Sequence, residues 1–310
     1  MTTTQPDPPP APSRTLCLGE ALVDLICEAP VERLAEAGSF TPHFGGVVAN
    51  VAVFAARAGA RVALAGGAGA DDWGRWLRNR LEDEGVEVSL FELAEDRQTP
   101  LAVVAVDARG EPHYHLYGGD RSGIVAAVGE RVQEAVHDSA ALFISSNTLV
   151  GEEERALTMR ARELMLELER PVIFDPNVRL HRWSSRADAA ASANACVPGA
   201  LLVRANEAEA ALMTGEEDPE RAALALVKAG ARLVVITLGA GGAILRGELR
   251  ADAPGVPARV LSSIGAGDAL TGLLLARLAG TGFYPPAVAA SLRDAVEAGA
   301  RACERWGALD

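Results

Sequence analysis

The chain has 310 residues, 49% of them hydrophobic, and carries a formal net charge of -13 at pH 7. Its length and apolar content suffice for the core of one α/β domain with, at most, a small accessory part. The acidic balance excludes binding to a nucleic-acid backbone, which needs a clustered basic surface. It does not exclude ATP, because glycine-rich loops, Mg²⁺ and one or two local cations hold phosphates without a positive overall field.

Residues 1–13 contain neither a basic start nor an apolar stretch, so we expect a disordered tail rather than a signal peptide or an anchor. No stretch approaches about 18 uninterrupted apolar residues, so no membrane span is predicted. Four cysteines are scattered without paired spacing, at Cys17, Cys27, Cys196 and Cys303. This spacing indicates neither a zinc site nor a disulfide framework and favours a reducing, cytoplasmic compartment.

From residue 15 onward, short apolar runs alternate with amphipathic segments rich in Ala, Leu, Arg and Glu. The apolar runs predict buried strands at 15–19, 62–66, 141–145, 172–175, 201–204 and 233–237. Apolar positions at three-to-four spacing predict helices at 49–58, 73–84, 152–168, 186–195, 207–213, 219–229, 268–278 and 286–305. This alternation is typical of β-α units, so residues 14–310 are expected to form one doubly wound α/β domain with a mainly parallel sheet flanked by helices.

Two stretches interrupt the alternation, at about 23–44 and 98–122. In the second, two apolar runs on either side of an Asp107-Ala-Arg-Gly110 turn predict a β-hairpin over 100–117. Ligands bind beyond the carboxyl ends of the strands in open α/β sheets, so these inserts are expected to form a small β lid over that edge. The alternative is an ordinary surface hairpin. A lid with exposed strand edges is also expected to pair two copies into a homodimer.

The most informative segment is Gly265-Ala-Gly-Asp268, which leads into an apolar helix. Backbone N–H groups at such a helix start can surround an anion, and the helix dipole adds partial positive charge there. Gly265, Ala266 and Gly267 could therefore stabilise a phosphoryl group while Asp268 takes a proton from an attacking alcohol. The alternative is a tight strand-to-helix turn in which Asp268 merely caps the helix.

The sequence lacks several other motifs of nucleotide binding and catalysis. It contains no P-loop, no Gly-x-Gly-x-x-Gly after a strand, no Gly-x-Ser-x-Gly nucleophile elbow and no His-Glu-x-x-His zinc site. A kinase hypothesis therefore depends on the segment at 265–268 and on the segments that accompany it.

Those segments, taken in order from about residue 16 to 307, resemble the ribokinase-like (PfkB) carbohydrate kinases. Gly265-Ala-Gly-Asp268 resembles the C-terminal signature of that family. Phe44-Gly-Gly-Val-Val-Ala-Asn50 resembles its Gly-Gly-x-x-x-Asn element, and Gly19-Glu-Ala-Leu-Val-Asp24 resembles its opening Gly-Glu-x-Leu-x-Asp element. The resemblance implies a ribokinase-like fold with a small β lid.

The resemblance also implies a sugar site. Asp24 would accept hydrogen bonds from sugar hydroxyls, Asn50 would bind another hydroxyl, and Gly45 and Gly46 would let the sugar approach the backbone next to Asp268. Polyols require such paired donors and acceptors. Taken singly, a polar strand end and a loop turn explain the same residues.

A nucleotide site is implied by three further segments. Phe174-Asp-Pro-Asn-Val-Arg179 resembles the fructokinase-like branch, in which Asn177 and Arg179 would face the nucleotide phosphates. The alternatives are an Asx-Pro turn and a surface salt bridge. Thr237-Leu-Gly-Ala-Gly-Gly242 resembles the loop that supports the nucleotide, through Thr237, Gly239 and Gly242.

The third segment, Asn206-Glu-Ala-Glu209, resembles the Asn-x-x-Glu element that organises Mg²⁺ and phosphate, often through water. Oxygen ligands suit a hard cation, so Asn206 and Glu209 are the expected metal residues, each acting indirectly. The alternative is capping of the helix that starts there.

Two departures from the family affect details. Ser262-Ser263 replaces the Asp-Thr that many relatives have before the signature, which removes a carboxylate from their monovalent-cation site and argues against potassium activation. Gly118 stands after Tyr117 where related kinases often have Arg, and Arg121 is the nearest candidate to replace it.

The resemblance implies an ATP-dependent, Mg²⁺-dependent sugar kinase. Fructose or a related ketose is the favoured substrate, because the segment at 174–179 and the Ala-Val-Asp-Ala-x-Gly-Glu hairpin are similar to those of fructokinases. Ketodeoxygluconate, ribose, an inositol and a nucleoside remain alternatives. A catalytically silent sugar-binding or regulatory protein is the alternative from another class.

Overall fold

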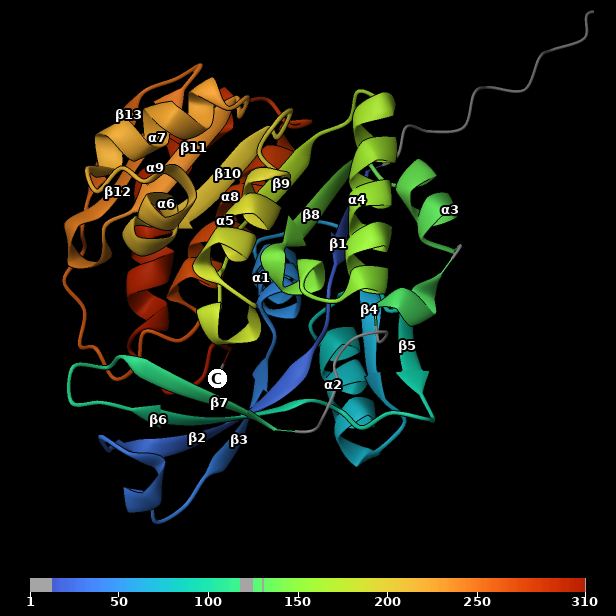
Figure 1. Ribbon diagram of the computed structural model, residues 1–310, viewed down its shortest axis with the longest axis vertical. Helices are drawn as coiled ribbons and strands as arrows, with labels where there is room; N and C mark the ends of the chain where they lie inside the picture. Colours follow the sequence, from blue (N-terminus) through green and yellow to red (C-terminus); the bar gives the residue numbers. More distant parts are fainter. Residues whose placement is uncertain (1–12, 118–124, 130, 310) are drawn as a thin grey trace, which may run out of the picture.

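The computed structural model describes residues 13–117, 125–129 and 131–309. Within these residues, nine strands form one large sheet in the order β13-β12-β11-β10-β9-β8-β1-β4-β5 (Figure 1). Neighbouring strands run parallel from β5 to β11, while β12 and β13 at one edge are antiparallel. The expected doubly wound, mainly parallel α/β fold is confirmed. The expected tail at 1–13 lies almost wholly outside the described residues.

The strands of the large sheet are β1 (Thr15–Leu18), β4 (Val62–Gly69), β5 (Phe91–Ala94), β8 (Ala141–Ser145), β9 (Val172–Asp175), β10 (Leu202–Asn206), β11 (Leu233–Thr237), β12 (Gly242–Gly247) and β13 (Ala251–Pro254). The α-helices are α1 (Val47–Arg57), α2 (Asp72–Asp83), α3 (Arg131–His137), α4 (Glu152–Glu167), α5 (Arg186–Asn194), α6 (Glu207–Thr214), α7 (Pro219–Lys228), α8 (Ala266–Gly280) and α9 (Pro286–Ala302). In the described part of the chain, no helix has the length and apolarity needed to cross a bilayer.

Helices cover both faces of the large sheet, because its central strands are apolar on both sides. Along β1, Leu16 and Leu18 pack in one hydrophobic cluster with residues of α3 to α7, whereas Cys17 packs in a second cluster with α1, α2, α8 and α9. Side chains alternate between the faces of a strand, so a continuous apolar run is what a strand buried on both faces requires. Figure 1 shows the two helical layers, with α4 to α7 in front of the sheet and α8 and α9 behind it.

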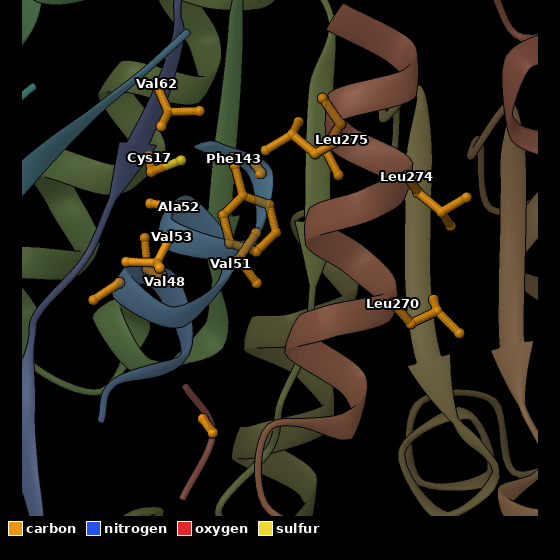
Figure 2. Packing of buried hydrophobic residues seen from close by; sticks show 14 of the residues in the cluster. Cys17, Val48, Val51, Ala52, Val53, Val62, Phe143, Leu270, Leu274 and Leu275 are labelled. Carbon is orange, nitrogen blue, oxygen red and sulfur yellow. The ribbon is translucent and has the colours of Figure 1, made fainter. Parts of the chain in front are cut away.

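Helices α1 and α8 pack closely against each other behind the sheet (Figure 2). Gly272 of α8 lies where a Cβ atom would be 2.5 Å from the Cβ of Phe54 on α1. The absence of a side chain at Gly272 therefore permits this close approach of the two helices. The packing matters for function because both helices carry predicted site residues near their N-terminal ends, Asn50 on α1 and Asp268 on α8.

A second, small sheet has the order β3-β2-β6-β7. Its strands are β2 (Leu22–Pro30), β3 (Thr41–Gly45), β6 (Leu101–Val106) and β7 (Pro112–Tyr117). Strands β6 and β7 pair antiparallel and form the hairpin expected over 100–117. Figure 1 shows this sheet lying across the lower end of the large one.

The tip of the β6–β7 hairpin reaches the loop that precedes α8. The N–H of Ser263 donates to the carbonyl oxygen of Gly110 at 2.8 Å. A Cβ atom at Gly110 would lie 2.5 Å from a methyl carbon of Val260. Residues far apart in the sequence therefore meet at one end of the molecule.

The predicted helices and strands match the observed ones in type. Several predicted boundaries were wrong, and four elements were not predicted. Helix α8 begins at Ala266 rather than at residue 268, and α9 ends at Ala302 rather than at 305. No clear sequence pattern predicts α3, β5, β12 and β13, which are short or lie at or near the sheet edge. Gly118 and Arg121 lie outside the described residues.

Candidate active site

A cavity of about 860 Å³ lies between the carboxyl ends of the parallel strands and the small sheet. Fourteen of the residues predicted from the sequence line this one cavity: Asp24, Gly46, Asn50, Asn177, Arg179, Asn206, Glu209, Thr237, Gly239, Gly242, Gly265, Ala266, Gly267 and Asp268. Gly45 is the one predicted site residue that does not line the cavity. Segments distributed over most of the chain thus converge on one site.

Asp268 lies in the first turn of α8 and is only 6% exposed. The residue at the N-cap position is Gly265, with φ 77°, and no side chain caps the helix. The tight turn of the alternative is therefore present, with Asp268 in the first turn, where the helix dipole favours a carboxylate. One carboxylate oxygen of Asp268, Oδ2, accepts a hydrogen bond from Nδ2 of Asn50 at 2.8 Å. Burial raises the pKa of Asp268 from 3.8 to about 7, against the opposing effect of the Asn50 hydrogen bond. A carboxyl with this pKa can exchange a proton near neutral pH.

The Gly-Ala-Gly segment (residues 265–267) forms the start of α8 and allows no larger side chains at its glycines. A Cβ atom at Gly265 would lie 2.5 Å from the Cβ of Ala308, and one at Gly267 would lie 2.5 Å from Nη1 of Arg204. The first N–H groups of a helix lack partners within the helix, and the helix dipole places partial positive charge there. This segment faces the cavity beside Asp268, so it is suited to hold an anion.

Asp24 lies on β2, and its buried carboxylate lines the cavity. A Cβ atom at Gly45, on the paired strand β3, would lie 2.4 Å from Oδ2 of Asp24. Gly45 thus makes room for the Asp24 carboxylate rather than for a ligand directly. Asn50 uses Nδ2 for Asp268, while its Oδ1 has no hydrogen-bond partner among the described residues. That oxygen is buried and keeps an unused capacity to accept a hydrogen bond.

Asn177 and Arg179 follow β9 and reach the cavity from the other side. Asn177 has φ 37°, which is unusual for a residue other than glycine, and no described residue binds its buried Oδ1. The guanidinium carbon of Arg179 lies 5.0 Å from the centre of the Tyr114 ring, on β7 of the small sheet. Arg179 therefore joins the large and small sheets across the cavity through a cation–π contact.

Asn206 and Glu209 form a capping box at the start of α6. Oδ1 of Asn206 accepts from the N–H of Glu209 at 2.8 Å, and Oε2 of Glu209 accepts from the N–H of Asn206 at 2.9 Å. Oε1 of Glu209 accepts from the N–H of Val178 at 3.1 Å. The capping alternative is therefore present in the structure, and it leaves both carboxylate oxygens with spare lone pairs beside the cavity.

The acids near the cavity are too dispersed for direct chelation. In the described ranges there is no group of three or more His, Cys, Asp or Glu side chains that could hold a metal ion. Burial, followed by the negative charge of Asp175, raises the pKa of Glu209. A hydrated cation could interact with Glu209 through its water shell, whereas a closed protein cage is not formed.

Thr237 and the loop after it complete the wall at the end of β11. Gly242 has φ 98°, and a Cβ atom there would lie 2.1 Å from the carbonyl oxygen of Ala253. Gly239 also has a positive φ, of 53°. The hydroxyl oxygen of Thr237 accepts a hydrogen bond from Nη2 of Arg204 at 2.9 Å. The glycines thus shape a tight backbone loop along the cavity.

The sequence interpretation missed the buried pair of Arg204 and Asp175 at the base of the cavity. Nη1 of Arg204 lies 3.2 Å from Oδ2 of Asp175, and neither side chain is more than 7% exposed. A signal was available, because Arg204 is the one charged residue in the otherwise apolar run 201–205. A charge inside a buried strand needs a partner and indicates a site.

Tyr114 was also missed as a site residue. It lies on β7 and lines the cavity, and its burial, together with the nearby charge of Asp24, raises its pKa. The alternation of the predicted hairpin shows which residues share a face with Tyr114. It does not show which of the two faces turns towards the large sheet.

Comparisons with known proteins agree with this geometry. Residues 13–309 match the family described as pfkB family carbohydrate kinase. Fructokinase-1 of Oryza sativa subsp. japonica is 30% identical over 262 residues, which cover 84% of this chain and 81% of that protein. Fructokinase-1 of Zea mays shows the same identity and coverage.

Solved structures extend the similarity to the fold. A fructokinase double mutant from Vibrio cholerae O395, in a form with fructose, ADP and potassium ion bound, superposes with a TM-score of 0.82 at 29% identity, covering 96% of this chain and 94% of that chain. Aminoimidazole riboside kinase from Salmonella enterica, complexed with aminoimidazole riboside and an ATP analogue, gives 0.81 at 25% identity, with coverage of 96% and 95%. The chain therefore belongs to the pfkB family of carbohydrate kinases and is an ATP-dependent sugar kinase.

Proposed function

We propose that this kinase phosphorylates a hydroxyl group of fructose or a related ketose, with Asp268 as the general base. The observation that carries the proposal is the position of Asp268. It is buried in the first turn of α8, bound to Asn50, beside the Gly-Ala-Gly segment and in the same cavity as Asp24. A base, an anion-binding helix start and a polyol-binding carboxylate are the groups that this reaction requires.

The reaction begins with the sugar held between the two sheets. Asp24 accepts from hydroxyl groups, and Asn50 accepts another through its unpartnered Oδ1. Asp268 takes the proton from the reacting hydroxyl, whose oxygen attacks the γ-phosphorus of ATP in line as the bond to ADP breaks. Backbone N–H groups of Gly265 and Gly267 bind the oxygens of the phosphoryl group in transfer. The N–H of Ala266, between them, donates to the carbonyl oxygen of Ser263 at 3.3 Å and would have to exchange that bond to take part.

The nucleotide is assigned to the wall formed by the ends of β9, β10 and β11. Thr237, Gly239 and Gly242 support it, and Asn177 and Arg179, which line the same cavity, are assigned to the phosphates. Mg²⁺ held through water near Asn206 and Glu209 would offset phosphate charge. The raised pKa of Glu209 favours its protonated form, and a nearby cation would oppose this by stabilising the ionised carboxylate.

The small sheet is assigned the role of a lid. It covers the cavity through Asp24 and Tyr114, and the tip of its hairpin contacts the loop before α8. Such a cover excludes water, which would otherwise compete with the sugar for the phosphoryl group. We also propose that two copies pair through the outer strand edges of the same sheet, which light scattering would test. The proposed compartment is the cytoplasm.

Fructose is favoured by the relatives and by the segment at 174–179. The two plant proteins described above are fructokinases, and the Vibrio cholerae structure contains fructose. The Salmonella enterica structure contains aminoimidazole riboside, so ribosides form the second substrate class to be tested. Ketodeoxygluconate, ribose and inositols complete the panel.

Potassium activation is not expected of this kinase. The Ser262 hydroxyl is buried and accepts a hydrogen bond from the N–H of Ile264 at 3.1 Å, so it supplies no charge to a cation site. The same assays with potassium, sodium and tetramethylammonium would test this point. A strong and selective activation by potassium would contradict it.

The experiment that tests the function is ADP release from ATP and Mg²⁺ across this panel. One strong substrate among the ketoses, with loss of the signal in Asp268→Asn, would support the proposal. Turnover of a riboside and of no ketose would contradict the proposed substrate but would leave the proposed mechanism unchanged. Ligand-induced thermal stabilisation without any ADP release would favour the catalytically silent binding protein instead.

A further inference from the structure

The feature that the proposed mechanism leaves unused is the buried guanidinium of Arg204, under the Gly-Ala-Gly segment. Arg204 lies on β10 and is 6% exposed. Its Nη1 lies 3.2 Å from Oδ2 of Asp175, on β9, and its Nη2 donates to the hydroxyl oxygen of Thr237, on β11, at 2.9 Å. The hydroxyl of Thr271, on α8, donates to the same oxygen of Asp175 at 3.0 Å. The network thus ties three neighbouring strands to the helix that carries the proposed base.

The guanidinium also contacts the backbone of the Gly-Ala-Gly segment. A Cβ atom at Gly267 would lie 2.5 Å from Nη1, 2.6 Å from Nη2 and 2.7 Å from Cζ of Arg204. The guanidinium therefore occupies the space that a side chain at Gly267 would take. Arg204 also lines the cavity, next to the segment to whose N–H groups the mechanism assigns the transferring phosphoryl group.

The charges around this position make Arg204 more than a spacer. Asp175, Glu209 and Asp268 all raise the pKa of Arg204, and Arg204 in turn lowers the pKa values of Glu209 and Asp268. A cation among three buried carboxylates allows more than one of them to be ionised together. A buried ion pair adds little net stability compared with a well-packed apolar pair, so stability alone does not account for it.

We propose that Arg204, held by Asp175, is a positioning residue of the phosphoryl-transfer site: it supports the Gly-Ala-Gly segment from behind and keeps Asp268 ionised while the sugar hydroxyl is deprotonated. This inference rests on the proposed function, because it assigns Arg204 a role through Asp268. The role assigned to Arg204 acts through Asp268 and the Gly-Ala-Gly segment.

Several other groups face Asp268 and bear on its ionisation. The titratable and charged residues near it, on the elements packed around the cavity, are Tyr114 on β7, Asp175 on β9, Arg179 after β9, Arg204 on β10 and Asp24 on β2. Arg179 also lowers the pKa of Asp268, but it contacts the small sheet through Tyr114. Arg204, in contrast, is fixed within the large sheet whatever the position of the small one.

The test is the dependence of kcat on pH for Arg204→Met, Arg204→Lys and the double variant Arg204→Met with Asp175→Asn. Arg204→Met leaves the charge of Asp175 unpaired, so the acidic limb of the profile should move up by about one pH unit or more. Removal of both charges should bring the limb back towards the wild-type position. In Arg204→Met and in the double variant, the plateau of kcat at high pH should be about tenfold lower than in the wild type. Both variants lose the side chain that supports the anion-binding N–H groups.

Arg204→Lys separates charge from shape. A lysine keeps the positive charge but lacks the planar group that packs on Gly267, so its limb should stay in place while its plateau falls. A limb and plateau unchanged from wild type in Arg204→Met would overturn the inference. So would a double variant whose limb moves as far as that of Arg204→Met.

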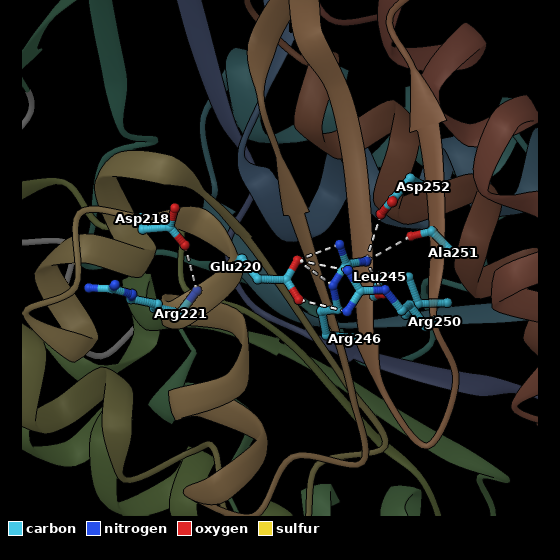
Figure 3. A network of polar contacts seen from close by, with 8 residues as sticks. All are labelled: Asp218, Glu220, Arg221, Leu245, Arg246, Arg250, Ala251 and Asp252. Atoms are coloured by element: carbon cyan, nitrogen blue, oxygen red, sulfur yellow. Dashed lines mark hydrogen bonds and ion pairs between the residues drawn. The ribbon is translucent and has the colours of Figure 1, made fainter.

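A matched control exists in the same fold. Arg246, on β12, is 3% exposed and pairs with Glu220 and Asp252, away from the cavity lining (Figure 3). Arg246→Met should lower the melting temperature but leave the limb and the plateau unchanged. If Arg246→Met moved the limb as Arg204→Met does, loss of any buried arginine would explain the effect, and the inference would fail.

The inference and the proposed function fail in different ways. Absence of sugar-dependent ADP release in the wild type, or full activity of Asp268→Asn, would contradict the proposed function. An active wild type, an inactive Asp268→Asn and an unchanged Arg204→Met would contradict only the role of Arg204.

Discussion

Asn50 and Asp268 are joined by a hydrogen bond of 2.8 Å although they lie 218 positions apart in the sequence. Each is close to the start of its helix, and the two helices are held together by the packing around Gly272. The geometry of the proposed base therefore depends on the hydrophobic core behind the sheet, not only on residues in the cavity. Substitutions of Asp268 and of Asn50 are therefore expected to have different effects on kcat and on its pH dependence.

Asp268→Asn should abolish most turnover while the protein stays folded. Asparagine has nearly the same size and can stay bound to Asn50 through its oxygen, but it cannot accept the hydroxyl proton. Loss of a general base costs about 10²- to 10⁴-fold in rate. The measurement is kcat with the best sugar of the panel, with circular dichroism and ATP binding as controls for the fold. Activity close to that of the wild type would remove Asp268 from the mechanism.

Asn50→Leu should move the pH dependence of kcat. The wild-type rate should rise with pH through about 7, because the pKa of Asp268 is raised to that value and only the ionised carboxylate can act as the base. The hydrogen bond from Asn50 favours the ionised form, so its loss raises the pKa further and moves the limb to higher pH. The sugar KM should also rise, as Oδ1 of Asn50 is lost. A profile with its limb near pH 4 in the wild type would contradict this account.

The contribution of Asp268 to the stability of the wild type should fall as pH rises from about 4 to about 7. In this range the folded protein keeps a proton on Asp268 that the unfolded chain, with a pKa near 3.8, has already released. The stabilisation is present below pH 4 and is lost as pH passes through 7. Asp268→Asn lacks this titration, so its stability relative to the wild type should rise across the range by a few kcal/mol, on the order expected for such a shift.

Urea unfolding of both proteins at several pH values measures this difference. Other groups titrate as well, including Glu209, and they cancel when the two proteins are compared at each pH. A difference in stability that does not change between pH 4 and 8 would show that Asp268 has an ordinary pKa.

The sequence predicted the strands of the sheet and the hairpin because these features are local, whereas most of the fourteen cavity residues were predicted from the resemblance to the kinase family. Apolar runs and glycine turns, such as those before Asp268 and after Thr237, reflect neighbours in the chain. The pairing of Arg204 with Asp175 depends on the order of β9 and β10 in the sheet, which no local pattern contains. The capping box at Asn206 was visible in the sequence as an alternative, and the structure contains it.

Tyr114→Leu should raise the KM for ATP, whose phosphates are assigned to Arg179, more than it lowers kcat. The Tyr114 ring holds the guanidinium of Arg179 across the cavity, and a cation–π contact is worth about 0.5–2 kcal/mol, or roughly 2- to 30-fold in binding. Tyr114→Phe keeps the ring and should behave almost like the wild type. Equal KM values for the two variants would show that the ring face has no role in binding.

Gly267→Ala should strongly lower kcat, whereas Gly280→Ala, in the same helix, should not. A methyl group at Gly267 meets the guanidinium of Arg204 at 2.5 Å, so either the helix start or the buried arginine must move. Nothing lies within 4 Å of the corresponding position at Gly280, near the end of α8, and alanine there should be neutral or stabilising by up to about 1 kcal/mol. Thermal unfolding and kcat of the two variants provide the comparison. Since both changes add one methyl group to α8, a loss of activity confined to Gly267→Ala would locate the effect at the anion-binding end of the helix, and equal activities would show that this end tolerates displacement.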